Sequence, residues 1–358
     1  MAIPKTMLAA QFTAYNNPYE IRTIPVPQDL EPYDVLIKVA VASHCHTDFN
    51  VCRGNWGSPL PCTGSHEGAG TVAAVGSAVK PEDLKVGDRV MGGMLLRPCG
   101  TCYDCTGPET NRQYCMGKKG FPGVTADGFY AEYVLVDARH TAKLPEGVDM
   151  VSASPLACAG RTVWRALKIA ALEVGQTVAI VGAGGGLGHL AIQFAKAWGL
   201  RVIALDVRDE ALTLCRDSGA DVVLDARNSD AEVISAVQAA TGGLGAHSTI
   251  NMSFARESVA LSCAITRMHC TVIQVAEPEM VEIPPDELVF RDIRIRSTLI
   301  SSGDESREML KDVVKHTIKV ETQLFRGLDK LPELLKMAKS SSRCGRLCLV
   351  IDEEQLNI

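Results

Sequence analysis

Four cysteines lie close together in a stretch rich in glycine and proline: Cys99, Cys102, Cys105 and Cys115. Thiolates are soft ligands, and four of them can enclose one tetrahedral Zn²⁺ ion without leaving a coordination position open. An iron–sulfur cluster would use the same ligands, but no other feature of the sequence indicates electron transfer. Free structural thiols are the remaining alternative. The spacing therefore predicts a closed, structural zinc site.

A glycine-rich segment follows the apolar run TVAIV and precedes the helix-like run HLAIQFAKAW. Glycines permit a tight turn and let backbone N–H groups approach a pyrophosphate at the start of a helix. The strict G-x-G-x-x-G spacing is not met, so a simple strand-to-helix turn is the alternative. The segment is predicted to bind a dinucleotide through Gly182, Gly184, Gly185, Gly186, Leu187 and Gly188.

Asp206 ends the next apolar run, VIALD. A carboxylate at this place can accept hydrogen bonds from the adenosine ribose hydroxyls, and it would repel a 2′-phosphate. This favours NAD over NADP, although a turn carboxylate at a strand end is the simpler interpretation. Arg208, two residues later, could bind a phosphate, which keeps NADP open.

Helices and strands must position these residues, and the pattern of apolar residues along the chain changes near Pro155. Before it, apolar alternation at 35–42 and 129–136 predicts strands separated by turns. After it, short apolar runs alternate with amphipathic stretches, which predicts a Rossmann-type doubly wound parallel sheet in an α/β fold. Strands are expected at 177–181, 201–205, 221–224, 247–251, 270–275 and 293–300, with helices at 186–198, 209–218, 230–240 and 256–266.

The tail after Ser301 suggests helices at 305–316 and 331–339 and a strand at 346–351. It has no evident core of its own, so we expect it to pack against the N-terminal part. The predicted domains are therefore a β-rich domain of residues 1–157 and 302–358, and a dinucleotide-binding domain of residues 158–301.

Composition limits the kind of protein. The 358 residues suffice for two cores, and 46% hydrophobic with 22% charged residues is typical of a globular protein. Lys plus Arg total 36 against 42 for Asp plus Glu, a net charge of −6, and no basic block indicates a nucleic-acid or membrane partner. No apolar run approaches the ~20 residues of a membrane span. Thirteen cysteines cannot all pair, which favours reduced thiols and a cytoplasmic location.

Several segments together resemble the zinc-dependent medium-chain alcohol dehydrogenases, nearest the yeast and fungal branch. They are CHTD at 45–48, GSHEGAG at 64–70, the four-cysteine lobe, LACAG at 156–160 and the glycine-rich segment, in this order. The resemblance covers essentially the whole chain and implies a GroES-like catalytic domain. It also implies that Cys45, His66 and Cys158 bind a catalytic zinc with one open position. A buried apolar cysteine and a structural histidine are the alternatives for Cys158 and His66.

The resemblance further implies the reaction and two zinc ions per chain. Zinc would polarise an alcohol oxygen, and the resulting alkoxide would pass a hydride to NAD. Asp48 would orient His66, Glu67 would assist ligand exchange and Thr47 would pass the alcohol proton outward. The family's cofactor contacts fall here on His46, Thr162, Val275 and Arg346, for which surface or helix-start roles are the alternatives. Relatives form dimers or tetramers, so a homo-oligomer is expected, with a small alcohol, aldehyde or ketone as the partner.

The chain departs from the family pattern at three positions. Asn50 stands where yeast-type relatives often carry a relay histidine, so proton transfer should reach water without a final imidazole. Trp56 matches one aromatic wall of the pocket, but Met94 replaces the other, which predicts substrates bulkier than ethanol. Ser65 replaces a glycine without evident meaning.

An NADPH-linked carbonyl reductase and a non-catalytic zinc- and nucleotide-binding relative are the alternative functions. The cysteines outside both zinc sites are expected to be small apolar residues: Cys52, Cys62, Cys215, Cys263, Cys270, Cys344 and Cys348.

Overall fold

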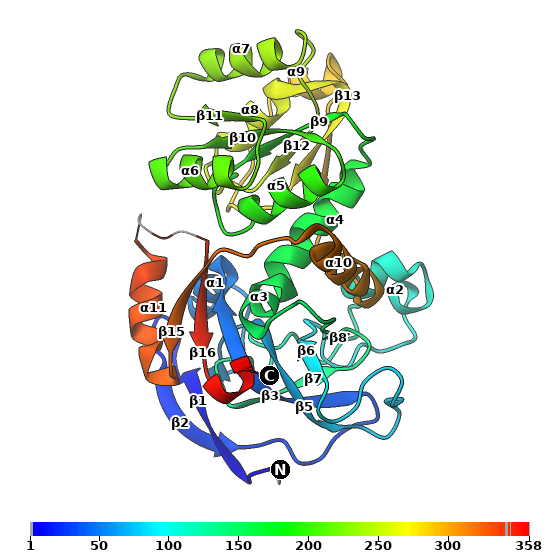
Figure 1. The fold of residues 1–358 in the computed structure, drawn as a ribbon, viewed down its shortest axis with the longest axis vertical. Helices are drawn as coiled ribbons and strands as arrows, with labels where there is room; N and C mark the ends of the chain where they lie inside the picture. The colour runs from blue at the N-terminus through cyan, green and yellow to red at the C-terminus, as the bar shows by residue number, and fades with distance from the viewer. Residues whose placement is uncertain (1–2, 341–342, 344, 358) are drawn as a thin grey trace. The chain divides into compact units, whose positions relative to one another are not determined.

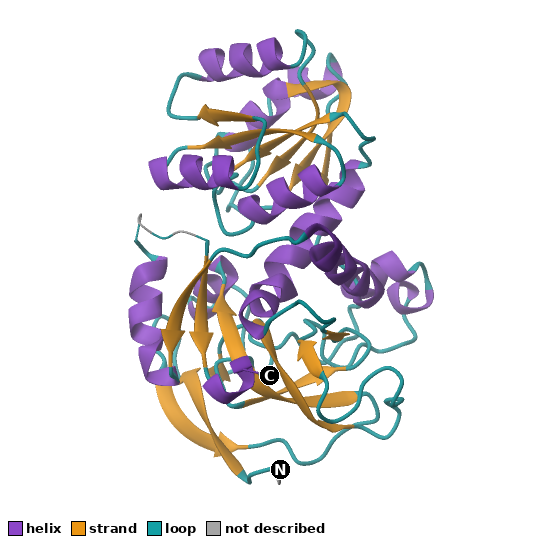
Figure 2. Cartoon of the chain, in the orientation of Figure 1, coloured by secondary structure: helices purple, strands orange, loops and turns teal. Residues whose placement is uncertain are grey.

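The computed structural model describes residues 3–340, 343 and 345–357, and the chain divides into two compact units (Figures 1 and 2). The first unit contains the described residues of 1–158, 301–315 and 322–358. The second contains residues 159–300 and 316–321. No helix in the described ranges combines the length and apolar character that crossing a membrane requires.

The first unit is built on a mixed sheet with the strand order β15-β16-β3-β5-β6-β8, in which β7 also pairs with β3. A smaller antiparallel sheet has the order β2-β1-β4. The strands are β1 (Thr6–Phe12), β2 (Glu20–Pro25), β3 (Asp34–His44), β4 (Cys62–Thr63), β5 (Glu67–Val75), β6 (Arg89–Met91), β7 (Tyr133–Asp137), β8 (Ala142–Lys143), β15 (Thr322–Arg326) and β16 (Arg346–Val350). The helices are α1 (His46–Cys52), α2 (Tyr103–Thr106), α3 (Met150–Pro155), α10 (Gly303–His316) and α11 (Leu331–Ala338), with short 3₁₀ turns η1 (Glu109–Tyr114), η3 (Leu328–Lys330) and η4 (Glu353–Asn357).

Strand β3 is the centre of this unit. One face, including Ile37 and Val39, packs in an apolar cluster with Leu334 of α11 and Leu349 of β16. Leu36, on the opposite face, packs in a separate cluster with residues of β1. Because both faces are covered, every residue of β3 except Lys38 is buried, and seven of the eleven are apolar. This rigid strand leads directly into Cys45 and helix α1.

The tail completes the same sheet. Strand β16 pairs antiparallel with β3, with Leu347 opposite His44, and β15 pairs parallel with β16. Strand β15 was not predicted, because its sequence TQLFR lies at the edge of the sheet and has no clear alternation of buried and exposed residues. Residues 316–321, between α10 and β15, belong to the second unit.

The second unit confirms the predicted doubly wound sheet. Its order is β11-β10-β9-β12-β13-β14, and every neighbouring pair is parallel. This is the dinucleotide-binding order 3-2-1-4-5-6. The strands are β9 (Thr177–Val181), β10 (Arg201–Asp206), β11 (Val222–Asp225), β12 (Ala246–Asn251), β13 (Thr266–Gln274) and β14 (Arg294–Ser297). The helices are α4 (Arg161–Ala170), α5 (Gly188–Ala197), α6 (Asp209–Asp217), α7 (Asp230–Ala240), α8 (Ser258–Ile265) and α9 (Pro285–Val289), and a π-helical turn, Leu156–Gly160, precedes α4.

Several predicted boundaries are wrong, and three of them have identifiable reasons. The strand expected at 129–136 begins only at Tyr133, because the N–H groups of Phe129 and Tyr130 bind the carbonyls of Ser65 and Gly64 instead of a ladder partner. The helix expected from residue 186 begins at Gly188, since the two preceding residues stay in a turn. The strand expected at 293–300 ends at Ser297, where the Thr298 hydroxyl accepts a hydrogen bond from Arg165.

Candidate active site and metal centres

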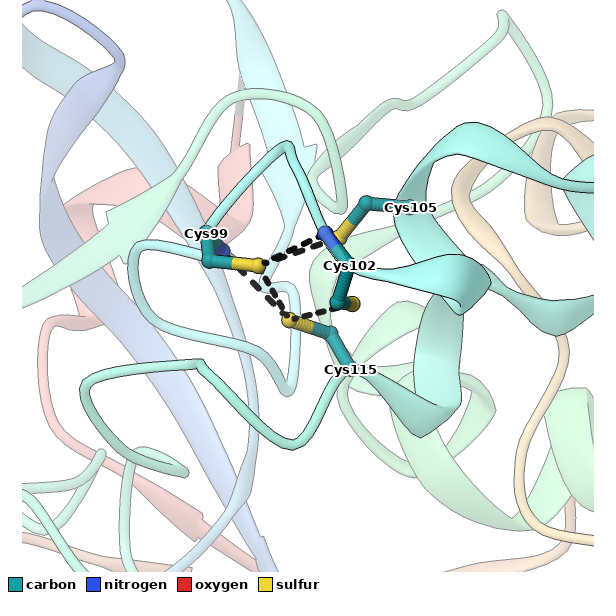
Figure 3. A group of neighbouring side chains, drawn as sticks. All are labelled: Cys99, Cys102, Cys105 and Cys115. Carbon is teal, nitrogen blue, oxygen red and sulfur yellow. Dashed lines mark hydrogen bonds between the residues drawn. The ribbon is translucent and has the colours of Figure 1, made fainter.

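The thiols of the four-cysteine lobe converge in the first unit (Figure 3). Sulfur–sulfur distances are 4.0 Å for Cys99 and Cys105, 3.8 Å for Cys102 and Cys115, and 3.6 Å for Cys99 and Cys115. Sulfurs bound at about 2.3 Å to one tetrahedral ion are separated by about 3.8 Å. The cluster therefore has the dimensions of a single-zinc site, whereas the thiolates of an iron–sulfur cluster bind different irons.

Backbone N–H groups of the lobe donate hydrogen bonds to these sulfurs and favour the thiolate form, which binds cations. The N–H of Cys102 donates to Cys99 Sγ at 3.3 Å, and the N–H of Cys99 donates to Cys115 Sγ at 3.4 Å. The backbone N–H groups of Thr101 and Cys102 lower the pKa of the Cys99 thiol to about 6, because they stabilise the thiolate. Arg97, just before the lobe, donates to both carboxylate oxygens of buried Asp34 and so ties the lobe to the start of β3.

A second group of metal-binding side chains forms where β3, β5 and the π-helical turn meet. One ligand atom from each of Cys45, His66, Glu67 and Cys158 lies within 4.8 Å of all the others. Cys45 precedes α1, His66 precedes β5, and Cys158 lies in the π-helical turn, a feature common at functional sites. The fold thus brings together three residues that the sequence keeps far apart.

Asp48 holds the ring of His66 in one orientation. Its Oδ1 lies 2.9 Å from His66 Nδ1, and its Oδ2 accepts a hydrogen bond of 2.8 Å from the backbone N–H of Cys45. His66 Nδ1 therefore carries the proton, which leaves Nε2 as a lone-pair donor. That Nε2 atom is buried and has no hydrogen-bond partner among the described residues. A buried lone pair with no partner is the arrangement expected of a metal ligand.

The two thiols of this centre also fit a cation. The Cys158 thiol and then His66 lower the pKa of Cys45 well below its usual value, against the opposing effect of burial. The pKa of Cys158 is raised well above its usual value, first by its hydrogen bond to Cys45 and then by burial. One thiolate thus forms readily, while the second needs a positive charge beside it. Two thiolates and an imidazole are ligands that suit Zn²⁺.

Glu67 lies beside these ligands in an ionic contact that sequence reasoning missed. Its Oε2 accepts hydrogen bonds from Arg346 and from the Ser43 hydroxyl, and its Oε1 lies 3.9 Å from His66 Nε2. Burial raises the pKa of Glu67 to about 7, although the Arg346 guanidinium acts in the opposite direction. Register explains the contact, because Ser43 in β3 is directly opposite Glu67 in β5. Arg346, expected at a pyrophosphate, is itself buried against this carboxylate.

The residues around the second centre differ in exposure. Thr47 Oγ1 lies 3.8 Å from Cys45 Sγ, and His46 is exposed. His44 is buried with Nδ1 at 3.1 Å from the Tyr130 hydroxyl, and burial lowers its pKa to about 4. It is therefore neutral near pH 7. Asn50 is half-buried in α1.

Met94 and Ser65, which depart from the family pattern, and Trp56, which matches it, also have clear locations. Met94 is buried and Trp56 is 36% exposed. Ser65 adopts a left-handed backbone with φ of 64°, where glycine is favoured, and its hydroxyl donates to the Ser43 carbonyl at 2.9 Å. Of the remaining cysteines, Cys62, Cys215, Cys263 and Cys348 are buried as expected, Cys52 and Cys270 are partly exposed, and Cys344 lies outside the described residues.

The glycine-rich loop connects β9 to α5 and leaves N–H groups available. Gly182 has a φ of 78°, and a Cβ on Gly188 would lie 2.3 Å from the Ala183 carbonyl oxygen. Gly188 therefore makes the close helix–strand contact that the motif assigns to its third glycine, one position later than the spacing predicts. The N–H groups of Gly186 and Leu187 have no acceptor in the described part of the chain. They remain able to donate to an anion at the start of α5.

The carboxyl ends of the parallel strands bring further predicted cofactor residues to one edge of the sheet. Asp206 ends β10, and its carboxylate accepts hydrogen bonds from the N–H groups of Gly184 at 3.0 Å and Val207 at 2.8 Å. Val275 directly follows β13 at this edge. Arg208 Nε lies 3.8 Å from Asp206 Oδ1. Thr162 is buried in the first turn of α4.

Comparisons with known proteins agree with this geometry. The family model for the alcohol dehydrogenase GroES-like domain matches residues 31–146, and the model for the zinc-binding dehydrogenases matches residues 186–315. Alcohol dehydrogenase 1 of Emericella nidulans is 34% identical over 350 residues, covering 96% of this chain and 98% of that protein. An alcohol dehydrogenase of Schizosaccharomyces pombe is 34% identical over 354 residues, covering 98% of this chain and 99% of that protein.

A solved structure supports the same assignment. The alcohol dehydrogenase from Aeropyrum pernix superposes with a TM-score of 0.86 at 31% identity, covering 96% of this chain and 99% of that one. Family models, relatives and fold therefore agree over nearly the whole length. The chain belongs to the zinc-dependent medium-chain alcohol dehydrogenase family.

Proposed function

We propose that this chain reversibly transfers a hydride between NAD and a primary or secondary alcohol bulkier than ethanol, giving an aldehyde or ketone. Cys45, His66 and Cys158 would hold a catalytic zinc, and the four-cysteine lobe a structural one. The observation that carries the proposal is the buried His66 Nε2, which has no hydrogen-bond partner among the described residues, in a side chain whose ring groups with two thiols as candidate metal ligands. A protein without metal chemistry would leave this nitrogen unsatisfied at a cost of about 1–3 kcal/mol.

Zinc and NAD would each supply part of the chemistry, and the chain's own residues would supply the rest. When bound, zinc supplies a Lewis acid that lowers the pKa of an alcohol O–H, and NAD supplies the hydride acceptor. Thr47, with its hydroxyl 3.8 Å from Cys45 Sγ, would accept the alcohol proton and pass its own proton outward. Asp48 would hold the His66 ring, and Arg346 would keep the Glu67 carboxylate close to the ligands.

NAD is the proposed cofactor because of the position of Asp206. The carboxylate is held by three backbone N–H groups at the edge of the sheet where dinucleotides bind, and its charge opposes a 2′-phosphate. His46, Thr162, Val275 and Arg346 are proposed as further cofactor contacts. The second candidate, an NADPH-linked carbonyl reductase, is favoured by Arg208, whose guanidinium lies 3.8 Å from the same carboxylate.

The remaining assignments are proposals of the same kind. Residues 158–301 would bind the dinucleotide, and residues 1–157 with 302–358 would carry the zinc ions. Met94, in place of a tryptophan, would widen the pocket beside Trp56 and admit branched, cyclic or aromatic substrates. A dimer or tetramer in the cytoplasm is expected of such an enzyme.

One experiment separates the candidate functions. The purified chain is analysed for zinc and then tested against a panel of alcohols and carbonyl compounds with NAD(H) and NADP(H). Two zinc ions per chain and higher kcat/KM with NAD and bulky alcohols are expected. Preference for NADP(H) would favour the reductase, and zinc binding without turnover would favour a non-catalytic relative. Ethanol as the best alcohol would refute the proposed substrate size.

A further inference from the structure

The peptide group between Gly185 and Gly186 in the dinucleotide loop is flanked by glycine on both sides. Glycine on both sides leaves this group free to rotate, because no Cβ restricts the backbone. A Cβ on Gly185 would meet only the Gly182 carbonyl oxygen, at 3.3 Å. The N–H of Gly186, like those of Leu187 and Gly188, has no acceptor in the described part of the chain. Its direction therefore depends on what holds the Gly185 carbonyl.

His189, in the first turn of α5, holds that carbonyl. Its side chain is 1% exposed, and its Nδ1 lies 3.1 Å from the Gly185 oxygen, which also accepts the backbone N–H of His189 at 3.2 Å. On the other side of the ring, the backbone N–H of Glu321 lies 3.2 Å from Nε2. A backbone N–H can only donate, so Nε2 must accept and Nδ1 must carry the proton. The ring thus donates to the Gly185 carbonyl in one defined tautomer.

Because the peptide bond is planar, the contact with the Gly185 carbonyl also sets the direction of the Gly186 N–H. In a trans peptide the C=O and the following N–H point in opposite directions. Holding the Gly185 carbonyl toward α5 therefore directs the Gly186 N–H away from the helix and into the half-buried loop. Orienting a donor before the ligand arrives reduces the ordering cost of binding.

We propose that His189 is a positioning residue for the cofactor: it locks the Gly185–Gly186 peptide so that the Gly186 N–H donates to the pyrophosphate. The inference rests on the proposed binding of a dinucleotide at this loop. It goes further by assigning pyrophosphate affinity to a side chain that does not itself touch the ligand.

The neighbouring Gln193 provides a matched control. Its side chain donates to the Lys319 carbonyl and accepts from the Lys319 N–H, both at 2.8 Å. Gln193 and His189 therefore both attach residues 316–321 to α5, and of these two side chains only that of His189 contacts the loop. Gln193→Ala loosens the attachment without releasing the Gly185 carbonyl.

Two replacements of His189 separate its two contacts. In His189→Asn the amide nitrogen is placed close to Nδ1 and can still donate to the carbonyl four residues earlier. In His189→Gln the longer side chain reaches the Nε2 position and can bind Glu321, but not Gly185. If the Gly185 contact positions the loop, Asn should preserve cofactor affinity and Gln should not.

The test measures the Kd of ADP-ribose, which contains the pyrophosphate but no nicotinamide, by calorimetry on the zinc-loaded chain. His189→Ala and His189→Gln should raise the Kd about 5- to 10-fold, the effect of about one hydrogen bond, while His189→Asn and Gln193→Ala stay within about twofold. Kinetics should show a higher KM for NAD with kcat little changed. Thermal unfolding checks that each variant folds.

Other results would overturn the inference. Equal losses in His189→Ala and Gln193→Ala would mean that His189 only attaches residues 316–321, and unchanged affinity in every variant would mean that the peptide needs no anchor. In the unmodified chain, ¹⁵N resonances of the His189 ring must report a protonated Nδ1, and a protonated Nε2 would contradict the assignment. If the unmodified chain bound neither ADP-ribose nor NADH, the proposed function would fail as well.

Discussion

Asp48 connects the backbone of Cys45 to the ring of His66, so Asp48→Asn tests how the candidate catalytic centre is held. Both carboxylate oxygens accept hydrogen bonds, from the Cys45 N–H at 2.8 Å and from His66 Nδ1 at 2.9 Å. Asparagine keeps the volume but has only one acceptor oxygen, so its NH₂ group faces one of these two donors. The variant therefore loses one hydrogen bond to a charged acceptor and leaves a buried donor unsatisfied.

The size of the effect follows from that loss. A hydrogen bond to a charged group contributes about 1.5–3 kcal/mol, and about 1.4 kcal/mol corresponds to a factor of ten in affinity. Zinc at this centre should therefore bind about 10- to 100-fold more weakly, in line with changes behind metal-bound histidines in general. The structural site should not change, because its four thiols have no contact with Asp48 among the described residues.

The assay measures zinc per chain by mass spectrometry after equilibration with increasing concentrations of chelator. The unmodified chain should retain two ions at a chelator concentration at which the variant retains one. Asp88→Asn is the control, because Asp88 is a buried carboxylate that accepts the Lys85 N–H at 3.0 Å and pairs with Lys143 at 2.7 Å. It should alter folding stability without changing zinc content. If Asp48→Asn retained its second zinc as well as the unmodified chain, the argument for Asp48 would be refuted.

Three further outcomes are expected. Asp206→Ala, which removes the carboxylate that accepts the Gly184 N–H, should raise the KM for NAD about tenfold and reduce discrimination against NADP in steady-state kinetics. Asn50→His should add a limb near pH 6.5 to the profile of kcat/KM, since it introduces a group that titrates there. Burial raises the pKa of Asp221, but the hydrogen bonds from Lys196 and the Val202 N–H outweigh it and leave that pKa below the ordinary 3.8. Its contribution to stability is thus fully present above pH 4 and decreases as the pH falls, so Asp221→Asn should lower the Tm more at pH 7 than at pH 3.

Local sequence was sufficient where chemistry depends on neighbouring residues. The four cysteines of the lobe span only 17 positions, so their spacing predicts their convergence. The alternation after Pro155 predicted the parallel sheet, because each strand and helix there carries its own periodicity. The glycine segment also indicated its loop, although the spacing could not show that Gly188 makes the close contact with Ala183.

The contacts of the second centre needed the tertiary structure. The resemblance to a known family grouped Cys45, His66 and Cys158, but no local pattern relates them, and the link between Glu67 and Arg346 was not predicted. Those contacts depend on strand register: Ser43 lies opposite Glu67 across β3 and β5, and Leu347, next to Arg346, lies opposite His44 across β16 and β3. A shift of one residue would turn each side chain to the other face of the sheet. The sequence by itself thus determined the types of ligand and the order of the elements, while the pairing of distant strands decided which side chains meet, because register depends on packing across the whole sheet.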